Sequence, residues 1–364
     1  MLVLAVETSC DDTAAAVLRD DRDLLSSVVS SQLTHREYGG VVPEIASRQH
    51  LQTILPTMEA ALERASVRPE ELDVIAATAG PGLLGSVLVG LSAAKAYAFG
   101  LGKPFVGVHH IEGHIFANWL VEDMVFPNVV LAISGGHTQL IHMQGIGQYA
   151  EIGATRDDAA GEAFDKIGKM MGIPYPAGPT FEKLALKGNP KAVGFTRARL
   201  KGAPFDFSFS GLKTAARLKL QDEGLVPETQ LSPLQGSAGA ARAGLHTTDR
   251  TPEELASLPQ NAYDILASAQ AAIADMLAEK CAAAVREKDV QHLYLAGGVA
   301  ANSCIRSTLQ EALGKRATLH APPPRLCTDN AAMIACVAHF KHKAGVETSY
   351  DVNAFARGAI RSWA

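Results

Sequence analysis

Leu2-Val3-Leu4-Ala5-Val6-Glu7-Thr8-Ser9-Cys10-Asp11-Asp12-Thr13, at the beginning of the chain, is the stretch that decides the fold. Its five successive apolar residues predict a buried strand. A short turn of hydroxyl and acidic residues follows, and apolar residues resume at 14–18 as a second strand. Such a turn presents backbone N–H groups to an anion and carboxylates to a metal ion or water. The stretch therefore predicts a strand, a polar turn that can bind ligands, and a second strand.

The same kind of strand end occurs twice more. Residues 128–133 form an apolar run that opens onto Ser134-Gly135-Gly136-His137-Thr138, and a strand of alternating pattern follows. Residues 292–296 end in a Gly297-Gly298 turn that leads to Asn302, whose amide can bond a ribose or a base. Strands alternate with helical stretches, which predicts an α/β fold of mixed sheets flanked by helices. Three such turns, spread over both halves, favour a nucleotide held in a cleft between two related domains.

The domain limits follow from this repeat. We place the first domain at residues 1–119, completed by a C-terminal helix at about 331–364, and the second at 120–330. A chain of 364 residues is long enough for two domains. Residues 222–254 are rich in Pro, Gly, Ser, Thr and Gln, and we expect them to be a mobile, exposed insertion.

A pair of histidines is the first candidate for chemistry. His110 and His114 stand four residues apart in His109-His110-Ile111-Glu112-Gly113-His114, so a helix places both rings on one face, where they can bind one metal ion. A zinc-peptidase helix has its Glu directly after the first His, whereas Ile111 stands there and Glu112 comes one residue later. Ordinary core or surface histidines are the alternative for an isolated pair of this spacing.

The composition indicates a soluble protein of a reducing compartment. Met1 leads straight into the strand and then into Glu7, which is not the pattern of a signal peptide. The five cysteines include no C-x-x-C pair, as is typical of cytoplasmic proteins. The apolar stretch 74–94 has the hydropathy of a membrane span, but its glycines and Pro81 favour a buried strand, a turn and a packed helix. We therefore expect a cytoplasmic protein without a membrane contact.

The net charge of −5 argues against broad nonspecific binding of nucleic acid, yet one stretch is strongly basic. Residues 183–219 contain nine basic side chains against the single acid Asp206. A solvated surface and a phosphate-binding patch both remain open at this point. Phe205, Phe207 and Phe209 alternate within it, which predicts one buried face of a strand rather than stacking platforms for bases.

Two helix starts carry acidic residues. Asp157 and Asp158 precede a helical stretch that contains Asp165 and Lys166, and we expect them to cap that helix. Asp329 precedes the final helix at 331–340, where an N-cap is the structural alternative to a functional role.

Taken together, these motifs resemble a known family. The turns at 7–13, 134–138 and 297–302 are similar to those of the superfamily of actin, the heat-shock chaperone ATPases and the sugar kinases (ASKHA). Within it, His-His-Ile-Glu-Gly-His (109–114), Gly-Gly-Val-Val-Pro-Glu-Ile-Ala-Ser-Arg (39–48), Ala-Gly-Glu-Ala-Phe-Asp-Lys (160–166) and Cys-Thr-Asp-Asn-Ala-Ala-Met-Ile-Ala (327–335) resemble the TsaD family. The resemblance covers nearly the whole chain, and its set of motifs is highly specific.

The resemblance implies a set of site residues. His110, His114 and Asp329 would hold one divalent metal ion, with Fe²⁺ the first choice and Zn²⁺ the second, and positions left open for substrate or water. Asp12 and Glu112 are the candidate catalytic carboxylates. Asp12 stands where many bacterial members have Glu, so its shorter side chain reaches less far. The substrate-binding positions are Ser134, Gly135, Gly136, His137, Thr138, Asp165, Gly178, Glu182 and Asn302.

The resemblance also implies an activity and partners. Members transfer a threonylcarbamoyl group from threonylcarbamoyl-AMP to N6 of adenosine 37 in tRNAs that read codons beginning with A. The tRNA offers its anticodon loop, TsaB forms a heterodimer with TsaD through the glycine-rich helix after Thr78, and the ATPase TsaE joins them. Two other classes remain as alternatives. A metallopeptidase is disfavoured by the position of Glu112, and a non-catalytic ATP-binding module of the chaperone or actin kind is disfavoured by the imidazole ligands.

Overall fold

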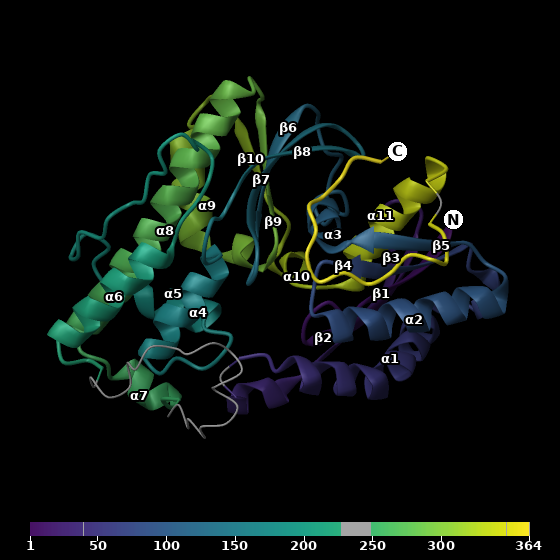
Figure 1. The fold of residues 1–364 in the computed structure, drawn as a ribbon, viewed down its shortest axis with the longest axis horizontal. Coiled ribbons are helices and arrows are strands. Elements are labelled where there is room, and N and C mark those ends of the chain that lie inside the picture. Colours follow the sequence, from purple (N-terminus) through teal and green to yellow (C-terminus); the bar gives the residue numbers. More distant parts are fainter. Residues whose placement is uncertain (39, 227–248, 347, 364) are drawn as a thin grey trace.

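The chain forms two five-stranded mixed sheets flanked by helices (Figure 1). The computed structural model describes residues 1–38, 40–226, 249–346 and 348–363. The strands of the first sheet are β1 (Leu2–Glu7), β2 (Asp12–Arg19), β3 (Asp23–Ser31), β4 (Val74–Gly80) and β5 (Phe105–His109). Those of the second are β6 (Asn128–Ile133), β7 (Thr138–Gly145), β8 (Gln148–Ala154), β9 (His292–Ala296) and β10 (Thr318–His320).

The two sheets have the same topology. The first runs β3-β2-β1-β4-β5 and the second runs β8-β7-β6-β9-β10, so the first strand of each half lies at the centre. On one side of that strand lies an antiparallel three-strand meander, and on the other side lie two parallel strands. Because β1 and β6 are buried on both faces, they are continuous apolar runs. The repeated strand, turn and strand predicted from the sequence is confirmed.

The two sheets separate three layers of hydrophobic core. On the outer face of the first sheet lie α1 (Pro43–Ala65) and α2 (Leu84–Leu101), and α3 (His110–Phe116) and α11 (Ala331–Lys343) lie between the sheets (Figure 1). One buried cluster joins the facing sides of both sheets to these two central helices, for example Val108, Val130 and Ile334. A helix that carries ligands at this place is therefore held from both halves of the molecule.

All but one of the remaining helices lie in the layer on the outer face of the second sheet. They are α4 (Ala160–Met170), α5 (Gly178–Ala185), α6 (Ser210–Asp222), α7 (Pro252–Ala256), α8 (Gln260–Glu287) and α9 (Ser303–Leu313). The exception is the short α10 (Pro324–Cys327), which contacts the turn after β9. Single 3₁₀ turns are η1 (Leu33–Tyr38), η2 (Pro69–Glu71) and η4 (Gly298–Ala301). The long helix α8 is the centre of this layer, since α5, α6 and α9 all contact it. Most residues of α8 are buried, as its alanine-rich sequence allows.

The apolar stretch 74–94 folds as β4 followed by the start of α2, which packs against β4 and α1. Within the described ranges, α2 is the one helix that is long and apolar enough to span a membrane by length and composition. A third of its residues are buried. Leu84, Leu88 and Phe99 are exposed large apolar side chains on it.

Three local predictions are wrong in detail. The final helix ends at Lys343, and residues 348–363, which we call the C-terminal strap, continue as irregular chain. Phe205, Phe207 and Phe209 are buried, but outside a regular strand, with one bridge between Thr155 and Phe207. The predicted insertion at 222–254 includes the helix α7 near its end. Its central part, 227–248, lies outside the described residues.

Candidate metal centre and substrate cleft

The histidine pair stands at the junction of β5 and α3. The strand ends at His109 and the helix begins at His110 without a linker, so the helix start lies at the carboxyl edge of the first sheet. His110 and His114 are one helical turn apart and both are buried. Their ring centroids lie 4.6 Å apart. The spacing therefore brings both imidazoles to one point between the sheets, as the sequence predicts.

Asp329 reaches the same point from between α10 and α11. We expected Asp329 as a possible N-cap of the final helix, but Asn330 occupies that place: its Oδ1 accepts from the Met333 N–H at 3.0 Å. The Asp329 carboxylate is thereby left to face the histidines. Its Oδ1 lies 3.2 Å from His114 Nε2 and 3.6 Å from His110 Nε2.

These three residues fit a metal ion. One ligand atom from each of His110, His114 and Asp329 lies within 4.8 Å of the other two. Both ring nitrogens of His114 are buried without a hydrogen bond to any described residue, although Nε2 is close to Asp329. Two imidazoles and one carboxylate are donors that iron and zinc accept, and they leave coordination positions open. The geometry therefore supports a single metal ion without identifying it.

Glu7 and Ser9 orient the His110 ring from the far side. His110 Nδ1 lies 3.0 Å from Glu7 Oε2 and 3.1 Å from Ser9 Oγ. Thr78 also donates to Glu7 Oε2. Burial lowers the pKa of His110, but the charges of Glu7 and Asp329 outweigh it and raise the value to about 9. In the neutral ring, a proton on Nδ1 held by Glu7 leaves Nε2 free for a ligand role, as an outer carboxylate does in many metal sites.

Asp12 lies at the start of β2, close to this cluster. Burial raises its pKa to about 6, and the negative charges of Asp329, Asp11 and Glu7 add to the rise against a hydrogen bond from Ser31. An acid with this pKa changes its protonation close to neutral pH, which is a property of groups that transfer protons.

Glu112, the other candidate catalytic carboxylate, is not brought to the cluster. It is 1% exposed, and its Oε1 accepts from the Tyr149 hydroxyl and from the Trp363 indole N–H. Its Oε2 lies 2.9 Å from the Lys341 ammonium. The physical reason is simple: two positions after His110, a helical side chain points away from the ligand face.

The loop 134–138 lies between β6 and β7, at the corresponding edge of the second sheet. Ser134 N–H donates to the His137 carbonyl at 2.9 Å, which closes a tight turn with Gly135 and Gly136 exposed at its tip. Burial and the nearby His110 and His114 lower the pKa of His137 to about 4, so this ring is neutral. Thr138 is fully buried and accepts from the Ala160 N–H. The exposed glycine tip is the part that can approach a ligand.

The other predicted substrate positions gather on the second half of the molecule. Asp165 accepts from the Ala177 N–H at 2.8 Å, directly before Gly178, and burial raises its pKa to about 6. Glu182 accepts from the Ser303 N–H at 2.8 Å. Asn302, the neighbour of Ser303, caps α9 and donates to Gln270. These residues therefore form a continuous set, in which Asn302 also has a structural task.

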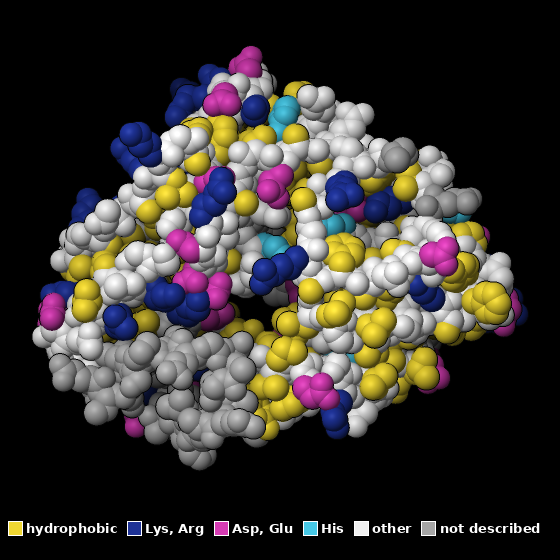
Figure 2. All heavy atoms as spheres, in the orientation of Figure 1, with side chains coloured by type: hydrophobic (Ala, Val, Ile, Leu, Met, Phe, Trp, Pro, Cys, Tyr) yellow, Lys and Arg dark blue, Asp and Glu magenta, His cyan; other side chains and the backbone are white. Residues whose placement is uncertain are grey.

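Figure 2 shows the surface hollowed between the two halves, with histidine and acidic side chains at the border of the hollow. The metal ligands come from α3 and the chain before α11, between the sheets, and the substrate positions from α4, α5 and the start of α9. The arrangement can hold a metal ion on one wall and a nucleotide-like ligand on the other.

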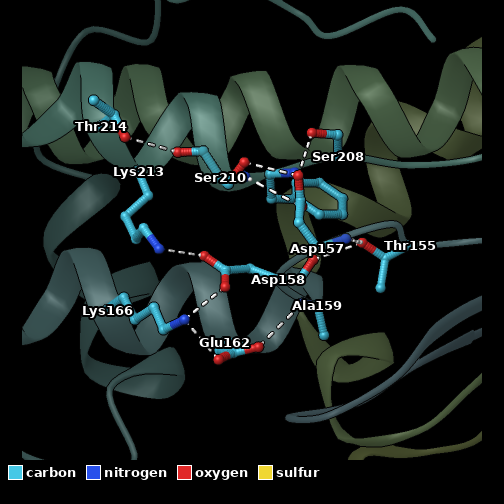
Figure 3. A network of polar contacts seen from close by, with 11 residues as sticks. Thr155, Asp157, Asp158, Ala159, Glu162, Lys166, Ser208, Ser210, Lys213 and Thr214 are labelled. Carbon is cyan, nitrogen blue, oxygen red and sulfur yellow. Dashed lines mark hydrogen bonds and ion pairs between the residues drawn. The ribbon is translucent and has the colours of Figure 1, made fainter. Parts of the chain in front are cut away.

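A second polar network fixes the helix α4, and it contains residues that sequence reasoning assigned differently (Figure 3). Asp157 and Asp158 do not cap α4. Asp157 accepts from the Phe209 N–H and from the hydroxyls of Ser208 and Ser210 at the start of α6. Asp158 lies between two ammonium groups, those of Lys166 at 2.6 Å and Lys213 at 2.8 Å. Phe209 lies 52 residues from Asp157 and Lys213 lies 55 residues from Asp158, so no local pattern indicates these two partners.

The basic stretch 183–219 is partly neutralised within the chain. Ion pairs join Arg197 to Asp275, Arg199 to Glu279, Lys213 to Asp158 and Lys219 to Glu223. Lys183, Lys191 and Lys201 are exposed, and no described residue pairs with them. The stretch is therefore a mixture of paired and unpaired cations.

Comparisons with known proteins concern the family of the chain. Residues 23–336 match the family model TsaD, described as tRNA N6-adenosine threonylcarbamoyltransferase. A protein of that name from Symbiobacterium thermophilum is 48% identical over 356 residues, which cover 97% of this chain and 95% of that protein. A second, from Bacillus subtilis, is 45% identical and covers 97% of this chain and 94% of its own length.

Solved structures support the fold. The structure of T. kodakarensis HypF superposes with a TM-score of 0.59 at 16% identity, over 96% of this chain and 49% of HypF. At that identity the likeness concerns the fold alone. With the family model matched over most of its length and two relatives above 40% identity, the chain belongs to the TsaD family.

Proposed function

We propose that the chain transfers the threonylcarbamoyl group of threonylcarbamoyl-AMP to N6 of adenosine 37 in tRNAs that read codons beginning with A, with release of AMP. Membership of the TsaD family supports this activity. The observation on which the proposal depends is the convergence of the ligand atoms of His110, His114 and Asp329 within 4.8 Å of one another. Neither alternative class gains support, because Glu112 is engaged away from the histidines and imidazole ligands do not suit Mg²⁺.

The chain's own residues would share the work. His110, His114 and Asp329 would hold one Fe²⁺ or Zn²⁺, with Fe²⁺ our first choice, and the bound ion would act as a Lewis acid towards substrate oxygens. Glu7 and Ser9 keep the His110 ring oriented. The exposed tip of the loop 134–138 would bind phosphate or carbamoyl oxygens through its N–H groups. Asp165, Gly178, Glu182 and Asn302 would bind the nucleotide.

The reaction needs one proton acceptor. The N6 amine attacks the carbamoyl carbon, the bond from that carbon to the phosphate oxygen of AMP breaks, and the amine loses one proton. Asp12 is our candidate for the acceptor of this proton, because a carboxylate with a pKa of about 6 is ionised at neutral pH and still basic enough to accept a proton. The target base, in an anticodon loop, is unstacked at modest cost.

We further propose the partners and compartment of this activity. TsaB would contact the exposed apolar side of α2, where Leu84, Leu88 and Phe99 are unburied, and TsaE would join the complex. The protein would act in the cytoplasm, without a membrane contact.

A product assay tests the proposal. Metal-loaded protein is mixed with TsaB, TsaE, threonylcarbamoyl-AMP and unmodified tRNA, and the digested nucleosides are analysed by mass spectrometry. We expect modified adenosine from the wild type and initial rates lower by a factor of about 100 or more for His110→Ala and Asp329→Ala, since even partners outside the first ligand shell contribute about 10–100-fold. No product from the assembled wild type would contradict the transferase and favour the binding module.

His109→Ala is the matched control. This neighbouring histidine of the same motif points to the Gly358 carbonyl in the C-terminal strap and not to the cluster. We expect it to keep the wild-type rate to within a few-fold. An equal loss for all three variants would mean that the stretch has a structural role only.

A further inference from the structure

Glu112 lies inside the motif that carries the metal ligands, yet it has no part in the proposed reaction. Its carboxylate is almost completely buried, 1% exposed, and three donors surround it. Tyr149 of β8 donates from its hydroxyl at 2.8 Å, Trp363 of the C-terminal strap from its indole nitrogen, and Lys341 of α11 from its ammonium at 2.9 Å. Glu112 therefore joins four separate segments: α3, β8, α11 and the strap.

Two of these segments bear on the metal ligands. The helix α3 carries His110 and His114, and α11 begins two residues after Asp329. The pair Glu112–Lys341 is a bond between these two helices on the side away from the ligands. A bond at this place restricts both the rotation of α3 about its axis and the distance between α3 and α11. Those two quantities set the distance from the histidine nitrogens to Asp329.

The end of the strap is built into this junction. The backbone N–H of Trp363 donates to the Gly147 carbonyl. A Cβ on Gly147 would lie 2.3 Å from the indole ring, so only glycine at this position leaves room for the indole. The indole also stacks on Phe116 of α3 with centroids 6.4 Å apart, and the Lys341 ammonium lies 5.9 Å from its ring. The hairpin β7–β8 contacts Trp363 at the end of the strap, and Trp363 in turn packs against α3, the helix that carries His110 and His114.

Burying a carboxylate and an ammonium costs free energy that their attraction does not reliably return, so such a pair is weak evidence for stability. A better explanation is that the pair specifies one geometry. We infer that Glu112 is a positioning residue for the metal centre: with Lys341, Tyr149 and Trp363 it holds α3 in the rotation at which His110 and His114 converge with Asp329. The inference rests on the metal site of the proposed function.

Metal binding to the full-length protein tests this inference without reference to activity. Glu112→Gln keeps the acceptor for Tyr149 and Trp363 but removes the charge that pairs with Lys341. Affinity for Co²⁺, used as the probe for the metal site, and the visible absorption spectrum of the bound ion are measured beside the midpoint of thermal unfolding. We expect a dissociation constant about 10–100-fold higher for Glu112→Gln, with a changed spectrum.

Asp206→Asn is the control for a loss of stability. It removes the charge with which the Asp206 carboxylate pairs with the Arg156 guanidinium, in the second half of the molecule and away from α3. We expect lower thermal stability but an unchanged Co²⁺ affinity and spectrum. Trp363→Phe keeps an aromatic ring but removes the indole donor together with part of the fused ring, and it replaces Glu112→Gln if that variant does not fold. We expect a smaller change in the same direction.

The outcomes separate the two proposals. Wild-type affinity and spectrum in the folded Glu112→Gln and Trp363→Phe variants would overturn the positioning role and leave the metal centre standing. An equal loss of affinity in Asp206→Asn would also overturn it, because general destabilisation would then be sufficient. A wild type that binds no Co²⁺, Fe²⁺ or Zn²⁺ would overturn the metal centre itself, and the positioning role with it.

Discussion

At the scale of single residues, Asp165 is a carboxyl group whose pKa is raised by burial, and this ties stability to pH. The value is about 6 in the folded protein and 3.8 for the ordinary group. Between pH 4 and 6 the unfolded chain therefore loses its proton while the folded chain keeps it. Stability contributed by the protonated group is present below pH 4 and declines as the pH rises to 6.

Asp165→Asn is expected to abolish this decline. An amide oxygen still accepts from the Ala177 N–H but does not titrate. From pH 4 to 6.5 the free energy of unfolding of the wild type should fall by about 2 kcal/mol relative to the variant, less than the full shift implies because the side chain is partly exposed. Urea unfolding of both proteins at each pH measures the difference. Parallel curves would contradict the raised pKa.

At the scale of elements, the start of α6 depends on a residue from a different segment. Asp157 accepts from the N–H groups of Phe209 and Ser210, which are groups that a helix start leaves without internal partners, and also from the Ser210 hydroxyl (Figure 3). Removing a cap of this kind costs about 1–2 kcal/mol.

Asp157→Ala is therefore expected to loosen the first turn of α6. Hydrogen exchange of the amides at 209–214 should become roughly 5–30-fold faster, which corresponds to about 1–2 kcal/mol. Asp157→Asn, which keeps an acceptor without the charge, should give a smaller change. Exchange that stays at the wild-type rate in Asp157→Ala would mean that the two serines hold the turn without the carboxylate.

The elements differ in how well the sequence predicts them. The central strands β1 and β6, their turns and the helices after Pro43 and Pro259 follow from long apolar runs or regular periodicity. The edge strand β8 does not, because half-exposed strands mix polar and apolar residues without a clear pattern. The helix cap at 329–330 was ambiguous because Asp and Asn suit that position equally. Two hydrogen bonds decide it in favour of Asn330, whose amide donates to the Thr328 carbonyl and whose Oδ1 accepts from the Met333 N–H.

The site, like the elements, has parts that local sequence predicts and parts that it does not. The spacing of His110 and His114 is local information and predicts their convergence. The partners of Glu112 cannot be read locally, because Tyr149 and Trp363 are 37 and 251 residues away. The resemblance of the motif to a family indicates which residues matter, and only the folded chain indicates which direction each side chain takes.

At the scale of the whole molecule, the two sheets have the same topology, and the surface is hollowed between the two halves (Figure 2). A tRNA is far larger than this hollow, so it must also contact the outer surface. Affinity for nucleic acid depends on how many cations contact phosphates, and the logarithm of the binding constant falls with the logarithm of salt concentration in proportion to that number. Net charge alone does not determine this slope.

The basic stretch 183–219 allows the effect of direct contacts between cations and phosphates to be separated from the effect of net charge. Lys183, Lys191 and Lys201 are exposed without a described partner. Replacing all three by Gln should weaken tRNA binding and reduce the salt slope by about 2 to 3. Filter binding of unmodified tRNA between 50 and 200 mM salt, roughly the range over which such contacts are lost, measures both.

A matched triple variant removes the same charge from paired residues. Arg197, Lys213 and Lys219 bond Asp275, Asp158 and Glu223, so they are less free to contact phosphates. Their replacement by Gln should reduce affinity with a smaller change of slope. Equal slopes for both variants and the wild type would place the tRNA on another surface. Equal reductions in both variants would mean that the overall field, and not direct contact by the unpaired lysines, attracts the tRNA.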